Sequence, residues 1–277
     1  MADPQSISDH WGRGDVFSMV LDAMKAAGID PATVTIAQLA PVDHFHARGF
    51  PATKELADIL PIRQGDHVLD IGCGIGGPAR YLADRFDCQV DGIDITEPFV
   101  EAANKLTQLV GLEGRVTIQC GDGQKLLYDD EVFDGAYAQH VTMNVADRDS
   151  FFGEAFRVLK PGAFFALTEH GLGAAGSPHH PVPWSDDGTG AFLVTPSETE
   201  VRLEKAGFAG IEVTDTGDKY LEGYKGAMAL AEKGELPLFG VHILLGKTAP
   251  QKIRNAARNI EEQRTRPVQI ICRKPVQ

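Results

Sequence analysis

The sequence predicts an α/β fold built on a doubly wound, mainly parallel sheet. From residue 62 onward, short apolar runs typical of strands alternate with helical patterns, which is the order of repeated βαβ units. Glycine and proline punctuate this alternation, and Lys160-Pro161-Gly162 is expected to end one helix and lead into the next strand. A loop with four glycines in six residues follows the first strand, where such sheets bind ligands.

The strands and helices of this domain can be placed from the spacing of apolar residues. Strands are expected at 67–71, 89–93, 115–119, 133–138, 163–168, 211–214 and 268–272, and helices at 78–85, 98–110 and 148–159. Ser197-Glu198-Thr199-Glu200 has the S-x-x-E pattern of a capping box, so a further helix is expected to begin there and to end at Gly207.

Three segments lie outside the alternation. Residues 1–61 contain helical patterns at 16–27 and 50–60, and residues 171–196 are rich in Gly, Pro and His, as a loop would be. The segment 219–265 holds helical patterns at 220–233 and 250–264, while 241–246 fits either a short strand or a helix turn. We therefore expect an N-terminal helical lid at 1–61 and a sheet domain at 62–277, with cap insertions at about 171–196 and 219–265.

Composition narrows the classes of protein that the chain can belong to. The net charge of -13 argues against a nucleic-acid-binding surface, which would carry a basic stripe. The sequence lacks an apolar run of membrane-spanning length and a signal-peptide pattern at its N-terminus. Its four cysteines form no C-x-x-C pair. These features predict a cytoplasmic protein with reduced thiols and no membrane span, and they leave monomer and homodimer equally open.

The glycine loop fits two nucleotide-binding patterns at once. Gly72, Gly74 and Gly77 make G-x-G-x-x-G, which indicates NAD or FAD, whereas Gly72, Gly74 and Gly76 make G-x-G-x-G. Asp94 lies at the end of the next strand, where a carboxylate can accept hydrogen bonds from both ribose hydroxyls. Because both cofactors contain ribose, Asp94 does not separate them.

Two further acids favour a cofactor without phosphates. Asp70 directly precedes the glycines, where it would repel a pyrophosphate and attract positive charge. S-adenosyl-L-methionine (AdoMet) fits, since it carries a sulfonium and an ammonium group. Asp122 follows the third strand and can accept a hydrogen bond from an adenine amino group. Together with Asp94, these acids form a negative line along the carboxyl edge of the sheet.

At this point the chain resembles the class I AdoMet-dependent methyltransferases. The motifs are Val68-Leu69-Asp70-Ile71-Gly72-Cys73-Gly74-Ile75-Gly76, Gly92-Ile93-Asp94-Ile95, Gly121-Asp122-Gly123, Phe133-Asp134-Gly135-Ala136-Tyr137 and Arg157-Val158-Leu159-Lys160-Pro161-Gly162. Gly77-Pro78-Ala79-Arg80-Tyr81-Leu82 and the N-terminal helices extend the resemblance to the small-molecule branch with sarcosine/dimethylglycine N-methyltransferases and sugar O-methyltransferases. The resemblance implies a Rossmann-like seven-stranded sheet of order 3-2-1-4-5-7-6, with 268–272 as antiparallel strand 7.

The resemblance also implies a set of cofactor-binding residues. Gly72, Gly74 and Gly76 would hold the methionine part of AdoMet, Asp94 the ribose and Asp122 the adenine. Asp70, Ile95, Gly123 and Gln139 complete the expected set. The product would be S-adenosyl-L-homocysteine, and the acceptor a small molecule methylated on N, O, S or C.

Polar residues after strands four and five are the candidates for catalysis. His140 follows the fourth strand, and Glu169 and His170 follow the fifth, so all three would flank an acceptor at the switch point of the sheet. We predict them as bases or acceptor ligands, and Glu169 fits the acid that follows strand five in sugar O-methyltransferases. The alternative is that the two histidines form only local hydrogen bonds or help to bind the cofactor.

Three other segments could take part in the site. Residues 43–49 could close over the cofactor, bringing His44, His46 and Arg48 to it, or could form a surface turn. His179-His180 suggests a metal, but no third ligand has a suitable spacing, so no metal is predicted. Trp184 and Phe192 could line an apolar acceptor pocket.

Two alternative functions stay open at this stage. The first is an NAD(P)-dependent oxidoreductase, against which Asp70 and Asp122 argue. The second is a non-catalytic AdoMet-binding protein, against which the polar residues after strands four and five argue. Binding of NAD(H) without AdoMet would favour the first, and tight AdoMet binding without turnover of any acceptor would favour the second.

Overall fold

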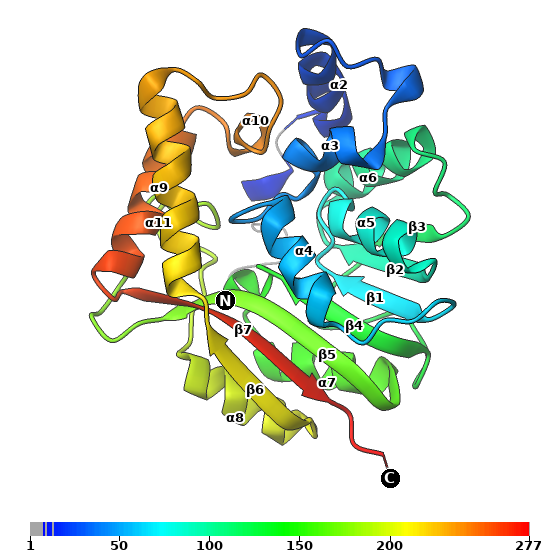
Figure 1. Cartoon of the computed structure of the whole chain (residues 1–277). Coiled ribbons are helices and arrows are strands. Elements are labelled where there is room, and N and C mark those ends of the chain that lie inside the picture. Colours follow the sequence, from blue (N-terminus) through cyan, green and yellow to red (C-terminus); the bar gives the residue numbers. More distant parts are fainter. Residues whose placement is uncertain (1–7, 9, 13, 277) are drawn as a thin grey trace.

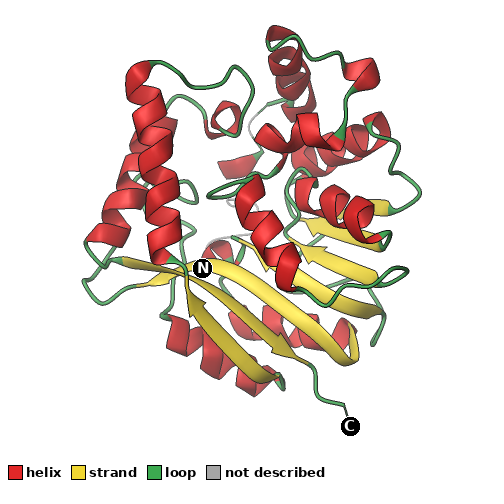
Figure 2. Cartoon of the chain, viewed as in Figure 1, coloured by secondary structure: helices red, strands yellow, loops and turns green. Residues whose placement is uncertain are grey.

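A seven-stranded sheet with helices on both faces forms the centre of the molecule (Figures 1 and 2). The structure is a computed structural model, and it describes residues 8, 10–12 and 14–276. The strand order is β3-β2-β1-β4-β5-β7-β6. The strands are β1 (His67–Ile71), β2 (Gln89–Asp94), β3 (Val116–Cys120), β4 (Phe133–Gln139), β5 (Leu159–Leu172), β6 (Ala209–Asp215) and β7 (Thr265–Arg273). Only β7 runs antiparallel to its neighbours, so the expected fold class and strand order are confirmed.

The helices of the sheet domain begin and end close to the predicted residues. They are α5 (Gly77–Phe86), α6 (Glu97–Leu109), α7 (Arg148–Val158) and α8 (Pro196–Ala206). The capping box of α8 uses Thr195 and Glu198 rather than the predicted Ser197 and Glu200. The Thr195 N–H donates to Glu198 Oε2 at 2.8 Å, and the Glu198 N–H donates to Thr195 Oγ1 at 3.3 Å. Two overlapping S/T-x-x-E patterns exist here, and Pro196 favours the earlier one because proline suits the first helical position.

The fifth strand begins earlier than the sequence indicates. β5 starts at Leu159, so Lys160-Pro161-Gly162 lies within the strand instead of forming a separate turn. The register against β4 shifts between Phe133 and Gly135, which accommodates the irregular residues as a bulge. The Gly162 N–H still donates to the Lys274 carbonyl at 2.8 Å. Pairing with the C-terminal end of the chain therefore keeps this proline-containing segment in the sheet.

Each face of the sheet has its own apolar core. One core joins Leu69 and Phe165 to Phe151 and Phe152 of α7 and to Leu203 of α8. The opposite core joins alternate strand residues to α5 and α6 and to α4 (Phe50–Ile59). Successive strand side chains point to opposite faces, and this places neighbouring apolar residues of one strand in different cores. The sheet is thus held on both sides, and only its carboxyl edge is left to carry a site.

Helices from two distant parts of the chain gather above that edge (Figure 1). The N-terminal part supplies α2 (Val16–Ala26), α3 (Ile36–Asp43) and the short 3₁₀ turn Pro31–Thr33. The insertion supplies α9 (Gly217–Lys233), α10 (His242–Leu245) and α11 (Ala249–Glu261), and α10 resolves the ambiguous segment as a helix. Phe239 packs in one cluster with Val20 and Leu39, and the Val241 N–H donates to the Pro41 carbonyl at 3.0 Å. The two parts therefore form one continuous cap.

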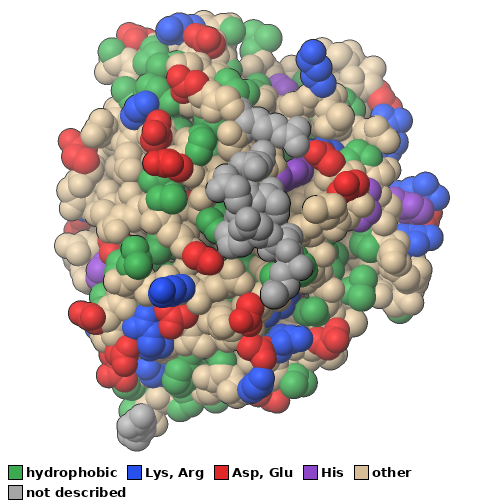
Figure 3. Space-filling model, turned by 180° about the vertical axis from the view of Figure 1, so that it is seen from behind, with side chains coloured by type: hydrophobic (Ala, Val, Ile, Leu, Met, Phe, Trp, Pro, Cys, Tyr) green, Lys and Arg blue, Asp and Glu red, His purple; other side chains and the backbone are tan. Residues whose placement is uncertain are grey.

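Surface charge, helix length and the state of the cysteines bear on the class of protein. On the face shown in Figure 3, the described Lys and Arg side chains are mixed with Asp and Glu and form no single basic stripe. Among the described residues, no helix is both long enough and apolar enough to cross a membrane. Cys73, Cys88 and Cys272 are buried free thiols, as expected, whereas Cys120 is exposed.

Candidate functional site

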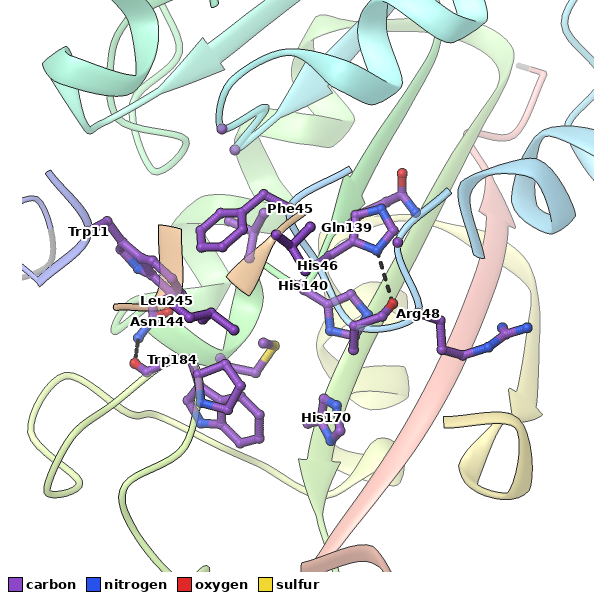
Figure 4. Close-up of a pocket in the computed structure, with 18 of the residues that line it drawn as sticks. Trp11, Phe45, His46, Arg48, Gln139, His140, Asn144, His170, Trp184 and Leu245 are labelled. Atoms are coloured by element: carbon purple, nitrogen blue, oxygen red, sulfur yellow. Dashed lines mark hydrogen bonds between the residues drawn. The ribbon is translucent and has the colours of Figure 1, made fainter. Parts of the chain in front are cut away.

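A cavity of about 1530 Å³ lies between the carboxyl edge of the sheet and the cap (Figure 4). Ligand pockets usually measure roughly 300–1000 Å³, so this volume has room for two ligands together. The structure brings nine of the predicted site residues to its wall. They are Gly72, Gly74, Asp94, Ile95, Asp122, Gly123, Gln139, His140 and His170.

Backbone N–H groups of the glycine loop donate hydrogen bonds to residues of β2, which fixes the shape of the loop. The Gly72 N–H donates to the Ile93 carbonyl at 2.7 Å, and the Gly74 N–H donates to Asp94 Oδ2 at 2.8 Å. At Gly74, φ is +55° and an added Cβ would meet no atom within 4 Å. The space in front of Gly74 is therefore free for a ligand.

Gly76 allows close packing of the loop, whereas Gly72 and Gly74 line the cavity. A Cβ at Gly76 would lie 2.5 Å from Ile118 Cδ1 and 2.9 Å from an Arg80 nitrogen. Gly76 does not line the cavity in the described part of the chain. Its missing side chain allows the loop to pack against α6 and β3, so its expected contact with a cofactor is not supported by its position.

Asp94 and Asp122 present carboxylates to the cavity from β2 and from the loop after β3. Asp94 accepts from the Gly74 N–H and, at 2.9 Å through Oδ1, from the Thr96 N–H. Burial raises the pKa of the Asp94 carboxyl. Asp122 Oδ1 accepts from the Gln124 N–H at 2.8 Å. The Gln124 side-chain amide also donates to both oxygens of Asp122. Asp122 Oδ2 and both oxygens of Asp94 keep a second lone pair, so both acids can still accept hydrogen bonds from a ligand.

Asp70 is a buried acid at the edge of the sheet, and its pKa is raised. It is 2% exposed, and the Tyr137 hydroxyl donates to its Oδ2 at 2.8 Å. Burial raises the pKa of Asp70 to about 8, and the nearby Asp94 charge adds to this, although the Tyr137 hydrogen bond opposes it. Asp70 lines a small side pocket of about 30 Å³, together with Gly72, Gly74 and Gln139. A cationic group in this pocket would restore the ionised carboxylate.

Four histidines form a cluster beside the cavity, and two tyrosines from the cap helix α9 contact the histidines. The histidine cluster consists of His44, His46, His140 and His170. His140 Nε2 lies 2.8 Å from the Tyr220 hydroxyl, and His170 Nε2 lies 3.1 Å from the Tyr224 hydroxyl. Burial lowers the pKa of His170 to about 3 and that of His140 well below its usual range. Both rings are therefore neutral at physiological pH.

The remaining two histidines share the hydroxyl of Thr53. His46 Nδ1 lies 3.1 Å from the Ala47 carbonyl, which can only accept, so His46 carries its proton on Nδ1. His46 Nε2 then accepts from Thr53 Oγ1 at 2.9 Å, and His44 Nδ1 donates to the same oxygen at 3.0 Å. Burial lowers the pKa of His44 to about 2 and that of His46 to about 4. The segment 43–49 is thus an internal part of the site and not the surface turn that was its alternative.

The structure does not bring Glu169 to the cavity. Its side chain is fully buried and accepts from Thr142 Oγ1 at 2.5 Å, from Thr199 Oγ1 at 2.7 Å and from Arg148 at 2.7 Å. Glu169 and His170 are neighbours in β5, so their side chains point to opposite faces. His170 faces the cavity, and Glu169 faces α7 and α8. The prediction of a catalytic Glu169 is therefore replaced by a structural ion pair that ties these helices to the sheet.

The cap contributes a mainly apolar wall. Figure 4 shows Trp11, Leu245 and Trp184 on one side of the cavity, and His46, His140 and Arg48 on the other. Trp184 lines the cavity, as predicted, and stacks on His170 with ring centres 4.7 Å apart. Phe192 is not among the described residues of the wall, so the second half of that prediction is wrong.

His179 is engaged in a structural contact. Its Nε2 lies 2.8 Å from Glu262 Oε2, and its N–H donates to Asn259 Oδ1 at 2.7 Å. These bonds fix the loop 171–196 to α11. Among the described residues, no group of three or more His, Cys, Asp or Glu side chains could hold a metal ion.

Sequence reasoning missed Tyr220 and Tyr224, which reach the histidine cluster from α9. Their i, i+4 spacing on a helix is visible in the sequence, since such residues share a face. Their partners are far away along the chain, however. His140 follows β4, 80 residues before Tyr220, and His170 lies near the end of β5, 54 residues before Tyr224. No local pattern indicates contacts over such separations.

Comparison with known proteins finds similarity to methyltransferases over the first five strands of the sheet. Residues 69–167 match the family model described as a methyltransferase domain. Over 117 residues the chain is 37% identical to 24-methylenesterol C-methyltransferase 3 of Arabidopsis thaliana, covering 42% of this chain and 33% of that protein. The chain spans only about a third of the length of the first curated relatives that it matches.

Solved structures extend the likeness to almost the whole chain. Phosphoethanolamine N-methyltransferase 2 of Haemonchus contortus, in complex with phosphomonomethylethanolamine and S-adenosylhomocysteine, has a TM-score of 0.75 at 21% identity, covering 97% of this chain and 60% of that one. The cyclase SpnF has a TM-score of 0.69 at 22% identity, covering 95% of this chain and 96% of that one. Identities this low show a shared fold, and one fold hosts several chemistries.

Proposed function

We propose that the chain, whose residues 69–167 match a methyltransferase domain, is a class I AdoMet-dependent methyltransferase that transfers a methyl group to a small molecule. The accepting atom is N, O, S or C. The observation that carries the proposal is the pair Asp94 and Asp122 on the cavity wall beside an open glycine loop, with Asp70 in the small side pocket next to that loop. The sterol and phosphoethanolamine methyltransferases among its relatives support a small-molecule acceptor.

The residues at the sheet edge fit AdoMet in shape and in charge. Asp94 and Asp122 have free lone pairs for ribose hydroxyls and an adenine amino group. Burial raises the pKa of Asp70, so a ligand ammonium beside it would favour the ionised carboxylate and be stabilised, whereas a pyrophosphate would oppose its ionisation. Gly74 leaves open space where a cofactor must approach the backbone. Ile95, Gly123 and Gln139 line the same region. When bound, AdoMet supplies an electrophilic methyl group on a sulfonium.

In the proposed reaction the protein positions the acceptor, excludes water from the cavity and offers neutral hydrogen-bonding groups. Methyl transfer is an in-line displacement, so holding the nucleophile in line and excluding water supply most of the acceleration. We assign His140 and His170 to this task. Both are neutral and can accept a hydrogen bond from the acceptor, but their low pKa values make them weak general bases. They therefore act chiefly by orienting the nucleophile, and Glu169 has no catalytic role in the proposal.

The other features of the protein stay predictions. We propose 1–61 as the lid and 62–277 as the methyltransferase domain, with the two insertions as its cap. A cytoplasmic location and the absence of a nucleic-acid partner rest on composition alone, and the oligomeric state stays open. A non-catalytic AdoMet-binding protein and an NAD(P)-dependent oxidoreductase are the rival proposals.

Transfer of label from methyl-labelled AdoMet to extracted metabolites tests the proposal. We expect labelled product with the native chain and its loss in Asp94→Ala, which removes the ribose acceptor and the partner of the Gly74 N–H. Tight AdoMet binding without labelled product from any metabolite extract would instead favour the non-catalytic rival.

A further inference from the structure

The cavity has two halves of different chemistry. The sheet half presents Asp94, Asp122 and the glycine loop. The cap half presents apolar and aromatic side chains, which include Trp11, Phe45, Met143, Trp184, Leu245 and Ile253. Only the sheet half is accounted for by a cofactor. The ligand of the cap half is therefore the acceptor, which rests on the proposed function because the sheet half is taken as the AdoMet site.

The two positive charges of the cap half share one carboxylate. Arg48 and Lys219 are the only Lys or Arg residues among the described residues of the wall. Arg48 forms a two-nitrogen contact with Glu55, and Lys219 Nζ lies 2.8 Å from Glu55 Oε2. The hydrogen bond from Arg48 lowers the pKa of Glu55 to about 2, so Glu55 is ionised and partnered. A phosphate on the acceptor would therefore have to compete with Glu55 for both cations.

The buried polar groups of the cap half are uncharged, and the wall carboxylates Asp147 and Glu222 belong to exposed residues. Burial keeps the histidine cluster neutral, and the tyrosine hydroxyls bind it. Besides Gln139 Nε2 in the sheet half, two buried polar atoms in wall residues, His170 Nδ1 and Trp184 Nε1, have no hydrogen-bond partner in the described structure. The rings stack on each other. A slight rotation of either ring would let one polar group of a ligand complete a hydrogen bond, whereas burying a charge here would go uncompensated.

From these observations we infer that the acceptor is an uncharged, mainly apolar molecule with one hydrogen-bonding group, and not a phosphate ester or an ammonium compound. The apolar body lies against the cap wall between Trp11, Trp184 and Leu245. Its polar group lies at the histidine cluster, near the switch point of the sheet. This separates the chain from its phosphoethanolamine relatives by the chemistry of the acceptor half.

Intrinsic fluorescence reports binding in this half without any methyl transfer. The chain has two tryptophans, Trp11 and Trp184, and both line the cavity. Three probes with one tail and different head groups are titrated: 1-decanol, decyl phosphate and decylammonium. Phosphoethanolamine is titrated beside them. Each titration is run with and without S-adenosylhomocysteine, whose own binding is measured separately by calorimetry.

We expect 1-decanol to change the tryptophan emission and to bind at least tenfold more tightly than either charged decyl probe. Equal or tighter binding of a charged decyl probe, or binding of phosphoethanolamine but not of 1-decanol, would overturn the inference, as would no response to any probe. Failure of S-adenosylhomocysteine to bind, with 1-decanol still preferred, would count against the methyltransferase proposal alone.

Two variants make the test independent of folding. Glu55→Gln removes the carboxylate that Arg48 and Lys219 share and frees both cations, so decyl phosphate should bind at least fivefold more tightly while 1-decanol is unaffected. A gain of binding cannot come from a damaged fold. Leu245→Asp should weaken 1-decanol at least fivefold, whereas the matched control Leu127→Asp, at a position 70% exposed and outside the wall, should not. Unchanged decyl phosphate binding in Glu55→Gln would contradict the role given to that ion pair.

Discussion

The buried acid Asp70 makes cofactor binding depend on pH in a way that can be calculated. Its pKa of about 8 means that the carboxyl is mostly protonated in the ligand-free protein at neutral pH. A ligand ammonium group requires the ionised form, so the apparent affinity scales with the ionised fraction. That fraction rises from about 1% at pH 6.0 to about 24% at pH 7.5, which predicts a roughly 24-fold tighter complex, or about 2 kcal/mol. The histidine cluster adds nothing, since its members are neutral throughout this range.

Isothermal titration calorimetry with S-adenosylhomocysteine at pH 6.0 and 7.5 measures this effect. In buffers of different ionisation enthalpy, binding at pH 7 should release about 0.9 proton per ligand. Asp70→Asn should bind more weakly at pH 7.5 and lose most of the pH dependence. An affinity that is flat between pH 6.0 and 7.5, or an equally steep dependence in Asp70→Asn, would refute the reasoning.

Three other predictions address the loop, the ion pair and the histidines. Gly74→Ala and its matched control Gly65→Ala both place an alanine at positive φ in open space and should each lose about 1 kcal/mol of stability. Only Gly74→Ala should also weaken S-adenosylhomocysteine binding at least tenfold, and equal affinities would remove the cofactor from that loop. Glu169→Gln should lower the free energy of unfolding by about 3 kcal/mol, because it leaves Arg148 buried without its carboxylate. Its cofactor affinity should change less than twofold, and native stability with lost turnover would restore a catalytic Glu169. The folded histidine cluster binds protons more weakly than the unfolded chain below pH 6.5, so stability is lost as pH falls. Between pH 7.5 and 5.5 these four groups should lower stability by about 5 kcal/mol, whereas the raised pKa of Asp70 should increase it by about 2.5 kcal/mol. Urea unfolding should therefore show a net loss of about 3 kcal/mol, and a net gain of stability would contradict the burial of the histidines.

The sequence was sufficient for the sheet and for the cofactor half of the site. Strand–helix alternation is a local signal, and the parallel order brings the ends of β1, β2 and β3 to one edge. Asp70, Asp94 and Asp122 could therefore be placed together without a structure. The capping box of α8 was misplaced because two overlapping patterns meet the same rule, and Pro196 decides between them.

The acceptor half could not be predicted in the same way. Whether Glu169 or His170 faces the cavity depends on the pleat register of β5, and a shift by one residue exchanges the two faces. Nothing in the local pattern sets that register, since the strand is nearly continuous in burial. The contacts of Tyr220 with His140 and of Arg48 with Glu55 depend on how the cap folds back over the sheet. Long-range packing of this kind leaves no periodic signature.

The central claim is that the glycine loop and its acids bind AdoMet and not a dinucleotide. Calorimetric titration of the native chain with S-adenosylhomocysteine and, separately, with NADH tests it most directly. The account predicts stoichiometric binding of S-adenosylhomocysteine that Asp94→Ala abolishes, and no heat from NADH. Binding of NADH at one site per chain, with no response to S-adenosylhomocysteine, would contradict the account.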